Sequence, residues 1–176
     1  LLRSDSGNGI KVPENSNFTL DLGGYTYTVS GQTVGSTGTE TLGFQLLKGS
    51  TITIKNGAIT AQSAQNYPVR ILIQNYSNLT LDNVKLTGDA NTDYVLSNNF
   101  GDTVLKNNTV ITAAEGNVAF DVYYGMADVY KDGVSVTIED GSVQVTGKIE
   151  YGMAPGADET EFAAKANLNV PADYTG

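Results

Sequence analysis

The sequence predicts an all-β chain in which short strands stack as successive coils, and three observations lead to this prediction. Apolar and polar residues alternate over short segments that Gly, Asn or Asp separates, which is typical of half-buried strands. Similar segments recur about every 24 to 33 residues, a period that indicates a stacked repeat. An apolar spacing typical of a helix is found only weakly, over residues 160–166, where one turn of helix and another loop both fit.

The strands are placed by superposing five segments, which are 18–27, 50–60, 78–87, 102–110 and 135–143. Their anchor residues are Leu22, Ile54, Leu81, Leu105 and Ile138. The residues two positions earlier are Leu20, Ile52, Leu79, Thr103 and Val136, and those five positions later are Tyr27, Ile59, Leu86, Val110 and Val143. Because stacked strands lie ~4.8 Å apart, these side chains are expected to fill one continuous interior column.

Two further features complete each unit. A second apolar stretch precedes each anchor strand, at residues 10–12, 44–46, 69–73, 94–96 and 118–122. The corner that follows each anchor strand holds a residue suited to a bend, namely Gly24, Asn56, Asn83, Asn107 or Asp140. We expect the amides of Asn56, Asn83 and Asn107 to hydrogen-bond one another as a ladder along this corner.

Stacked coils are favoured over a sandwich of hairpins, because the segments recur at a similar phase and require no hairpin pairing. We expect coils over residues 1–146 and a C-terminal coil or capping segment over residues 147–176. The chain starts with Leu1 rather than Met, which favours a mature or excised piece of a longer protein.

Composition excludes several classes of function. With 176 residues, of which 40% are hydrophobic, the chain can bury a core, yet no stretch approaches the ~20 apolar residues needed for membrane insertion. The absence of Cys and His removes disulfides, thiolate chemistry and the commonest general base. The net charge of -9 argues against a nucleic-acid partner. Fourteen of the 19 acidic residues lie in residues 89–176, where we expect a solvated face, with calcium or a basic partner as alternatives.

Three segments resemble the coils of a known superfamily. Residues 9–28, which read Gly-Ile-Lys-Val-Pro-Glu-Asn-Ser-Asn-Phe-Thr-Leu-Asp-Leu-Gly-Gly-Tyr-Thr-Tyr-Thr, look like the opening coil of right-handed parallel β-helix proteins of the pectate-lyase-like superfamily. Residues 50–60 and 78–87 look like later coils. The resemblance covers residues 9–146 and implies a single-stranded, right-handed parallel β-helix of about five coils. That fold carries lyases, hydrolases, adhesins, phage tailspikes and passive spacers, so it does not by itself indicate a function.

An enzymatic role has little support in the residues. The run Asn91-Thr92-Asp93 resembles one element of the polygalacturonase pattern, in which carboxylates activate water and protonate the leaving sugar oxygen. The following Asp pair, the Gly-His-Gly element and the Arg-containing motif of that pattern are missing from the chain, whose only Arg residues are Arg3 and Arg70. Arg70 is expected to point outward from its strand. We therefore predict no catalytic residues.

Calcium is the one metal that the sequence suggests. Asp89, Asn91 and Asp93 alternate in the way that the first ligands of a calcium loop do. Tyr94 stands where such a loop needs Gly, and Phe100 stands where its closing Glu belongs. A solvated turn is the alternative interpretation. A weaker candidate of the same kind is formed by Asp128, Asp132, Glu139 and Asp140.

Tyrosines in the acidic half form a candidate ligand site, whose members are Tyr123, Tyr124, Tyr130 and Tyr151. Tyr124-Gly-Met-Ala recurs 27 residues later as Tyr151-Gly-Met-Ala, which predicts equivalent side chains on adjacent rungs. Exposed rings beside carboxylates suit sugars, whose apolar faces stack on tyrosine. The alternatives are that Tyr124 and Tyr151 pad a wide coil, or that the patch is an oligomer or partner interface.

These features favour a non-catalytic module that presents a binding surface for a glycan or a protein. Richness in Thr, Asn and Gly, acidity and the lack of Cys match extracellular proteins, so we expect a bacterial cell-surface protein or a phage fibre or decoration protein. Two alternatives stay open. One is the β-helical part of a polysaccharide lyase or glycoside hydrolase, and the other is an architectural subunit of a homo-oligomeric assembly. No cofactor is expected apart from structural calcium.

Overall fold

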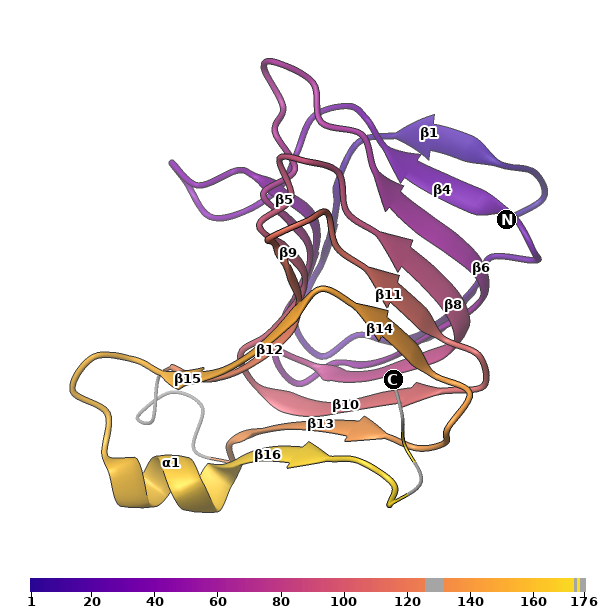
Figure 1. Cartoon of the computed structure of the whole chain (residues 1–176). Coiled ribbons are helices and arrows are strands. Elements are labelled where there is room, and N and C mark those ends of the chain that lie inside the picture. The colour runs from indigo at the N-terminus through magenta and orange to yellow at the C-terminus, as the bar shows by residue number, and fades with distance from the viewer. Residues whose placement is uncertain (126–131, 173, 175–176) are drawn as a thin grey trace.

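The structure, a computed structural model, is all-β apart from one short helix and describes residues 1–125, 132–172 and 174 (Figure 1). One sheet, here called sheet B, holds β2 (Ile10–Val12), β5 (Leu42–Leu46), β7 (Ile71–Asn75), β9 (Tyr94–Asn98), β12 (Val118–Tyr124) and β15 (Lys148–Met153). The other, sheet A, holds β1 (Asp5–Gly7), β3 (Asn17–Asp21), β4 (Thr26–Val29), β6 (Thr51–Ala61), β8 (Asn78–Thr87), β10 (Gly101–Lys106), β11 (Val110–Thr112), β13 (Val134–Ile138), β14 (Gln144–Thr146) and β16 (Ala166–Asn169).

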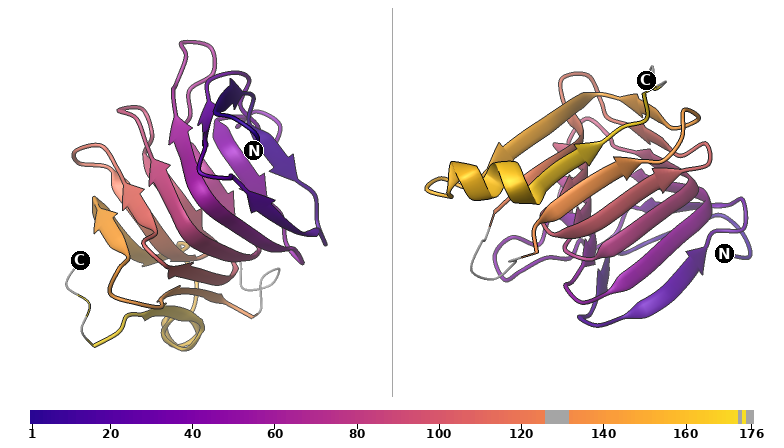
Figure 2. Two further views of the ribbon diagram at one scale, coloured as in Figure 1. Left: turned by 90° about the vertical axis from the view of Figure 1, so that its right-hand side faces the viewer. Right: turned by 90° about the horizontal axis from the view of Figure 1, so that it is seen from below.

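Neighbouring strands within each sheet run parallel. The chain passes through a strand of sheet B, then through sheet A, and returns to the next strand of sheet B, so that β5 pairs with β7 and β7 with β9. Figure 2 shows the strands of sheet A lying side by side from the N-terminal to the C-terminal end. Pairing of this kind is compatible with a parallel β-helix, and hairpins do not build the two sheets.

The register confirms most of the expected interior column. Ile54, Leu81, Leu105 and Ile138 are register partners along sheet A and lie almost wholly out of water. The first anchor was misplaced, because Leu20 rather than Leu22 pairs with Ile54. The reason lies in the first corner, which is two residues longer than the next one, so Leu22 lies buried within the corner itself.

The later part of the column also differs from the prediction in two units. Ile111 pairs with Leu86 on one side and with Val145 on the other, so Val110 and Val143 are not members of the column. Asn107 and Asn108 both have positive φ, at 52° and 61°. The corner in this unit therefore takes up one residue more than the corner at Asn83, and the following strand is shifted by that residue.

Asparagines bend sheet A at the corner, as the sequence predicted. Asn56 and Asn83 each have a φ of 56°, a left-handed conformation that asparagine tolerates better than most residues. The Nδ2 of Asn83 donates to the Oδ1 of Asn56 at 3.4 Å, which confirms one step of the ladder. Asn107 does not continue it, since its Nδ2 donates to Asp82 Oδ1 at 2.8 Å. The ladder is exposed rather than buried.

The segment after residue 146 adds strands to both sheets. β15 pairs with β12, and β16 pairs with β13. Between them lies α1 (Glu159–Lys165), where Asp158 caps the helix by accepting hydrogen bonds from the backbone N–H groups of Thr160 and Glu161. Of the two interpretations of residues 160–166, the helix is confirmed. The boundary at residue 146 stays a prediction.

Candidate functional site

The outer face of sheet B carries a continuous column of polar side chains. Register partners along this column are Lys11, Gln45, Gln74, Ser97, Asp121 and Glu150. Gln45 lies between the core residues Phe44 and Leu46, and Asp121 lies between Phe120 and Val122. Since side chains alternate along a strand, the column must point away from the core.

A groove of about 520 Å³ lies over the N-terminal half of this column. Its polar lining consists of Ser36, Thr39, Thr41, Gln45, Gln74 and Tyr76, and its apolar lining consists of Leu42, Leu47 and Ile71. Val34 and Leu42 exchange two backbone hydrogen bonds of 2.9 Å, which hold the loop that forms one wall against the start of β5. The groove therefore has one wall of sheet and one of loop.

The C-terminal half of the column is acidic. Asp121 is only 7% exposed, and its carboxylate accepts from the backbone N–H of Asn98 at 2.5 Å and from Ser97 Oγ at 3.1 Å. Burial raises the pKa of Asp121 to about 7, and the charge of Glu150 on the next strand adds to this rise, while the two hydrogen bonds oppose it. Asp121 therefore exchanges its proton near neutral pH.

Tyr94 joins the groove to the acidic half. It is the register partner of Ile71 in the groove, and its hydroxyl donates to Glu150 Oε2 at 3.0 Å. Burial, with the Glu150 carboxylate as the next cause, raises the pKa of the Tyr94 phenol to about 12, so the hydroxyl keeps its proton and remains a donor. The face thus combines amide, hydroxyl, carboxylate and aromatic groups.

A buried polar network lies directly beneath this face. Asn98 is fully buried, accepts from Thr103 Oγ1 at 2.7 Å and donates through Nδ2 to the backbone oxygen of Asp121 at 2.9 Å. Asn75, on the neighbouring strand, donates to Thr103 Oγ1 at 2.9 Å. The sequence analysis missed this network. Its signal was an Asn at the end of both the 71–75 and the 94–98 stretch, the same position in two successive units.

The four candidate tyrosines do not form one platform. β12 pairs Tyr124 with Met153 and Val122 with Tyr151, so the two motifs that are 27 residues apart are offset by two positions in the sheet. A bulge at Val118–Phe120 shifts the register in this pair of strands. The expected placement of Tyr124 and Tyr151 on equivalent positions of adjacent rungs is therefore wrong.

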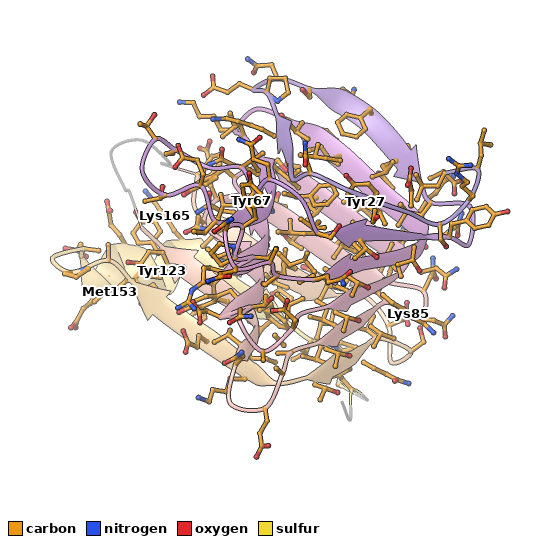
Figure 3. All side chains as sticks on the ribbon, turned by 90° about the horizontal axis from the view of Figure 1, so that it is seen from above. Tyr27, Tyr67, Lys85, Tyr123, Met153 and Lys165 are labelled. Carbon is orange, nitrogen blue, oxygen red and sulfur yellow. The ribbon has the colours of Figure 1, made fainter. Side chains whose placement is uncertain are left out.

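Each tyrosine has its own surroundings. Tyr124 is 2% exposed, lies in the core cluster and donates from its hydroxyl to Glu161 Oε2, in agreement with the alternative that it pads the coil. Tyr151 is half exposed, and its ring lies 4.8 Å from that of Phe162 in α1. Only Tyr123 lies on the outer face, where its ring covers Gly152 (Figure 3). Tyr130 lies outside the described residues.

The calcium candidates have other partners. Burial acts to raise the pKa of Asp89, but hydrogen bonds from the backbone N–H groups of Ser63 and Asn91 outweigh it, and the pKa is lowered. Asp93 forms an ion pair with Arg70 at 2.8 Å, and both side chains are exposed. The carboxylates thus stabilise the turn and its junction with β7, and Arg70 points outward as expected.

The weaker acidic run is likewise dispersed. Asp140 accepts from the backbone N–H groups of Asn107 and Ser142, which lowers its pKa, and Glu139 lies 3.9 Å from Lys106. Asp128 lies outside the described residues. Within residues 1–125, 132–172 and 174, no three acidic residues gather in a way that could hold a metal ion.

No helix in the described part of the chain is long and apolar enough to cross a membrane. Comparison of the chain with family models, with curated protein sequences and with solved structures gives no match.

Proposed function

We propose that this chain is a non-catalytic module that binds a glycan or a protein through the outer face of sheet B. The observation that carries the proposal is the alignment of amide, hydroxyl and aromatic side chains on that one face, next to a groove of about 520 Å³. Ligand sites combine a concave apolar surface with a few placed polar groups, and volumes of ~300–1,000 Å³ are usual.

The setting of the module is part of the proposal. We infer a right-handed parallel β-helix of about five coils, of the pectate-lyase-like kind, displayed outside a bacterial cell or on a virion. Parallel pairing along both sheets makes the strands a stiff support, since each one is held by its neighbours on either side. A stiff support keeps the groove and the tyrosines in a fixed arrangement, which reduces the entropy lost on binding.

The test is a glycan array together with a pull-down from host or cell-surface proteins, probed with paired variants. Tyr94→Ala with Tyr123→Ala removes two rings from the outer face of sheet B, and Tyr25→Ala with Tyr67→Ala removes two exposed rings elsewhere. We expect the first pair to abolish binding and the second to leave it unchanged. Equal binding by both pairs would refute the assignment to this face.

Glycan hydrolysis is a second candidate, favoured by one observation. Asp121 and Glu150 lie on adjacent strands at paired positions, and only Asp121 has a raised pKa, of about 7. A protonated acid beside an ionised carboxylate is the combination that glycosidases use. The experiment is to incubate polysaccharides with wild type, Asp121→Asn and Glu150→Gln and to measure new reducing ends. Release by wild type that both variants lose would establish hydrolysis and overturn the non-catalytic proposal.

A further inference from the structure

Gln45 holds a buried acceptor that nothing satisfies. The residue is 4% exposed, and its Nε2 donates to Gln74 Oε1 at 3.0 Å. Its Oε1 is buried, and the described part of the chain supplies no hydrogen-bond partner for it. Exchanging the two ends of the amide would only move the deficit to the nitrogen, because Gln74 contacts one end. Natural proteins seldom retain such an atom unless it serves a purpose.

The unsatisfied amide belongs to the groove lining. Gln74 and Tyr76 lie beside it on the sheet wall, while Thr39 and Thr41 line the loop wall. A ligand here would meet an acceptor, several hydroxyls and the edge or face of an aromatic ring. These groups suit a molecule that carries many hydroxyl donors on an apolar frame, which is the character of a sugar.

Charge narrows the class of ligand. Among the groove residues that the structure describes, none has an ionisable acid or a basic side chain. The same face carries Asp121 and Glu150 further along, and the net charge of the chain is -9. An anionic ligand would find no cation in the groove and a repulsive field around it.

We propose that the groove over Gln45 and Gln74 binds a neutral oligosaccharide and discriminates against uronates. The inference rests on the proposed function and narrows it to a ligand class and a place. Gln45 Oε1 accepts a hydrogen bond from a sugar hydroxyl, and the ring of Tyr76 offers a surface for the apolar side of a sugar. An extended peptide is a poorer match, because peptides add to the edge of a sheet through backbone bonds, and here the sheet presents its face.

The experiment compares matched ligands on the full chain. A glycan array selects the best neutral oligosaccharide, and calorimetric titration then compares it with its counterpart oxidised to the uronate at C6. The variants are Gln45→Leu, which removes the unsatisfied atom at similar volume, and Gln144→Leu, which makes the same change at an exposed position of β14. Thermal unfolding is measured on both.

We expect Gln45→Leu to weaken binding of the neutral sugar by about tenfold or more, without lowering the unfolding temperature, and Gln144→Leu to bind as wild type does. Tighter binding of the uronate would overturn the neutral class and leave the proposed function intact. Neutral binding that Gln45→Leu does not change would overturn the groove assignment. Binding of unmodified peptides in place of sugars, with the same dependence on Gln45, would overturn the sugar class.

Failure of the wider proposal has a different signature. If wild type binds no glycan of either kind and captures no protein through the Tyr94 and Tyr123 face, the proposed function itself fails. If it captures a protein through that face and binds no glycan, only the sugar inference fails.

Discussion

Polar side chains occupy two regions of this molecule in opposite ways. At the corner of sheet A, Asn56 and Asn83 are accessible to water, adopt the left-handed backbone that the bend requires and hydrogen-bond each other. On the outer face of sheet B, Gln45 and Asp121 are almost completely buried, although they point away from the core. One of these two has an acceptor without a partner, and the other has a pKa of about 7.

The difference separates structural polarity from polarity that needs another explanation. The corner amides solve a local problem of backbone geometry, and water can complete their hydrogen bonds. Burying Gln45 and Asp121 lowers stability, since both lose hydration that the protein only partly replaces. Features that cost stability and lie beside a groove are where a binding site is best sought.

The largest expected effect is the pH dependence that Asp121 imparts. Its pKa is about 7 in the folded chain and ~3.9 when unfolded, so the folded state binds more protons between these values. Stability therefore falls as pH rises from about 4 to about 7, by on the order of 3 to 4 kcal/mol. Urea unfolding across this range should show a decline in wild type that Asp121→Asn removes.

Other carboxyls do not mask this effect. The aspartates with lowered pKa are Asp21, Asp89, Asp140 and Asp158, and the stability they provide is lost only as pH falls below about 4. An Asp121→Asn profile that declines as steeply as wild type between pH 4 and 7 would contradict the assignment.

The next largest effect is expected for Asn98→Ala. The substitution removes the acceptor of Thr103 Oγ1 and the donor to the Asp121 backbone oxygen, and it leaves a buried space. We expect the free energy of unfolding to drop by about 3 kcal/mol, measured by urea denaturation. A loss below about 1 kcal/mol would mean that the network beneath sheet B does not support its outer face.

A smaller effect is expected at the exposed corner. Asn83→Ala removes one ladder hydrogen bond and places alanine at a φ of 56°, which should lower the free energy of unfolding by about 1 kcal/mol. Asn83→Gly retains the backbone conformation and should recover part of this loss. The same denaturation assay measures both. A greater loss at Asn83 than at Asn98 would reverse the comparison between the two regions.

The sequence predicted the stacked strands because their apolar period survives variable loops. The pairing of Ile54, Leu81, Leu105 and Ile138 followed directly from that pattern. The errors lie at corners, where an added residue shifts the next strand without altering its composition, as at Leu22 and Val110. A bulge in β12 caused the same kind of error for Tyr124 and Tyr151.

The candidate site was harder to predict. The hydrophobicity of the 42–46 and 118–122 stretches marks them as strands, but it does not show that Gln45 and Asp121 become buried on the outer side. That burial depends on which loop lies over which rung, as residues 36–41 lie beside β5. Tyr123 was identified as part of a site, whereas Tyr94 was noted only as a strand residue.

The side-chain amide signals in NMR provide the most direct test of the binding face. Gln45 and Gln74 represent the outer face of sheet B, and Asn56 and Asn83 represent the corner of sheet A. On addition of a neutral oligosaccharide that binds, the two glutamine signals should shift and the two asparagine signals should stay in place. Shifts at Asn56 and Asn83 with none at Gln45 and Gln74 would contradict the account.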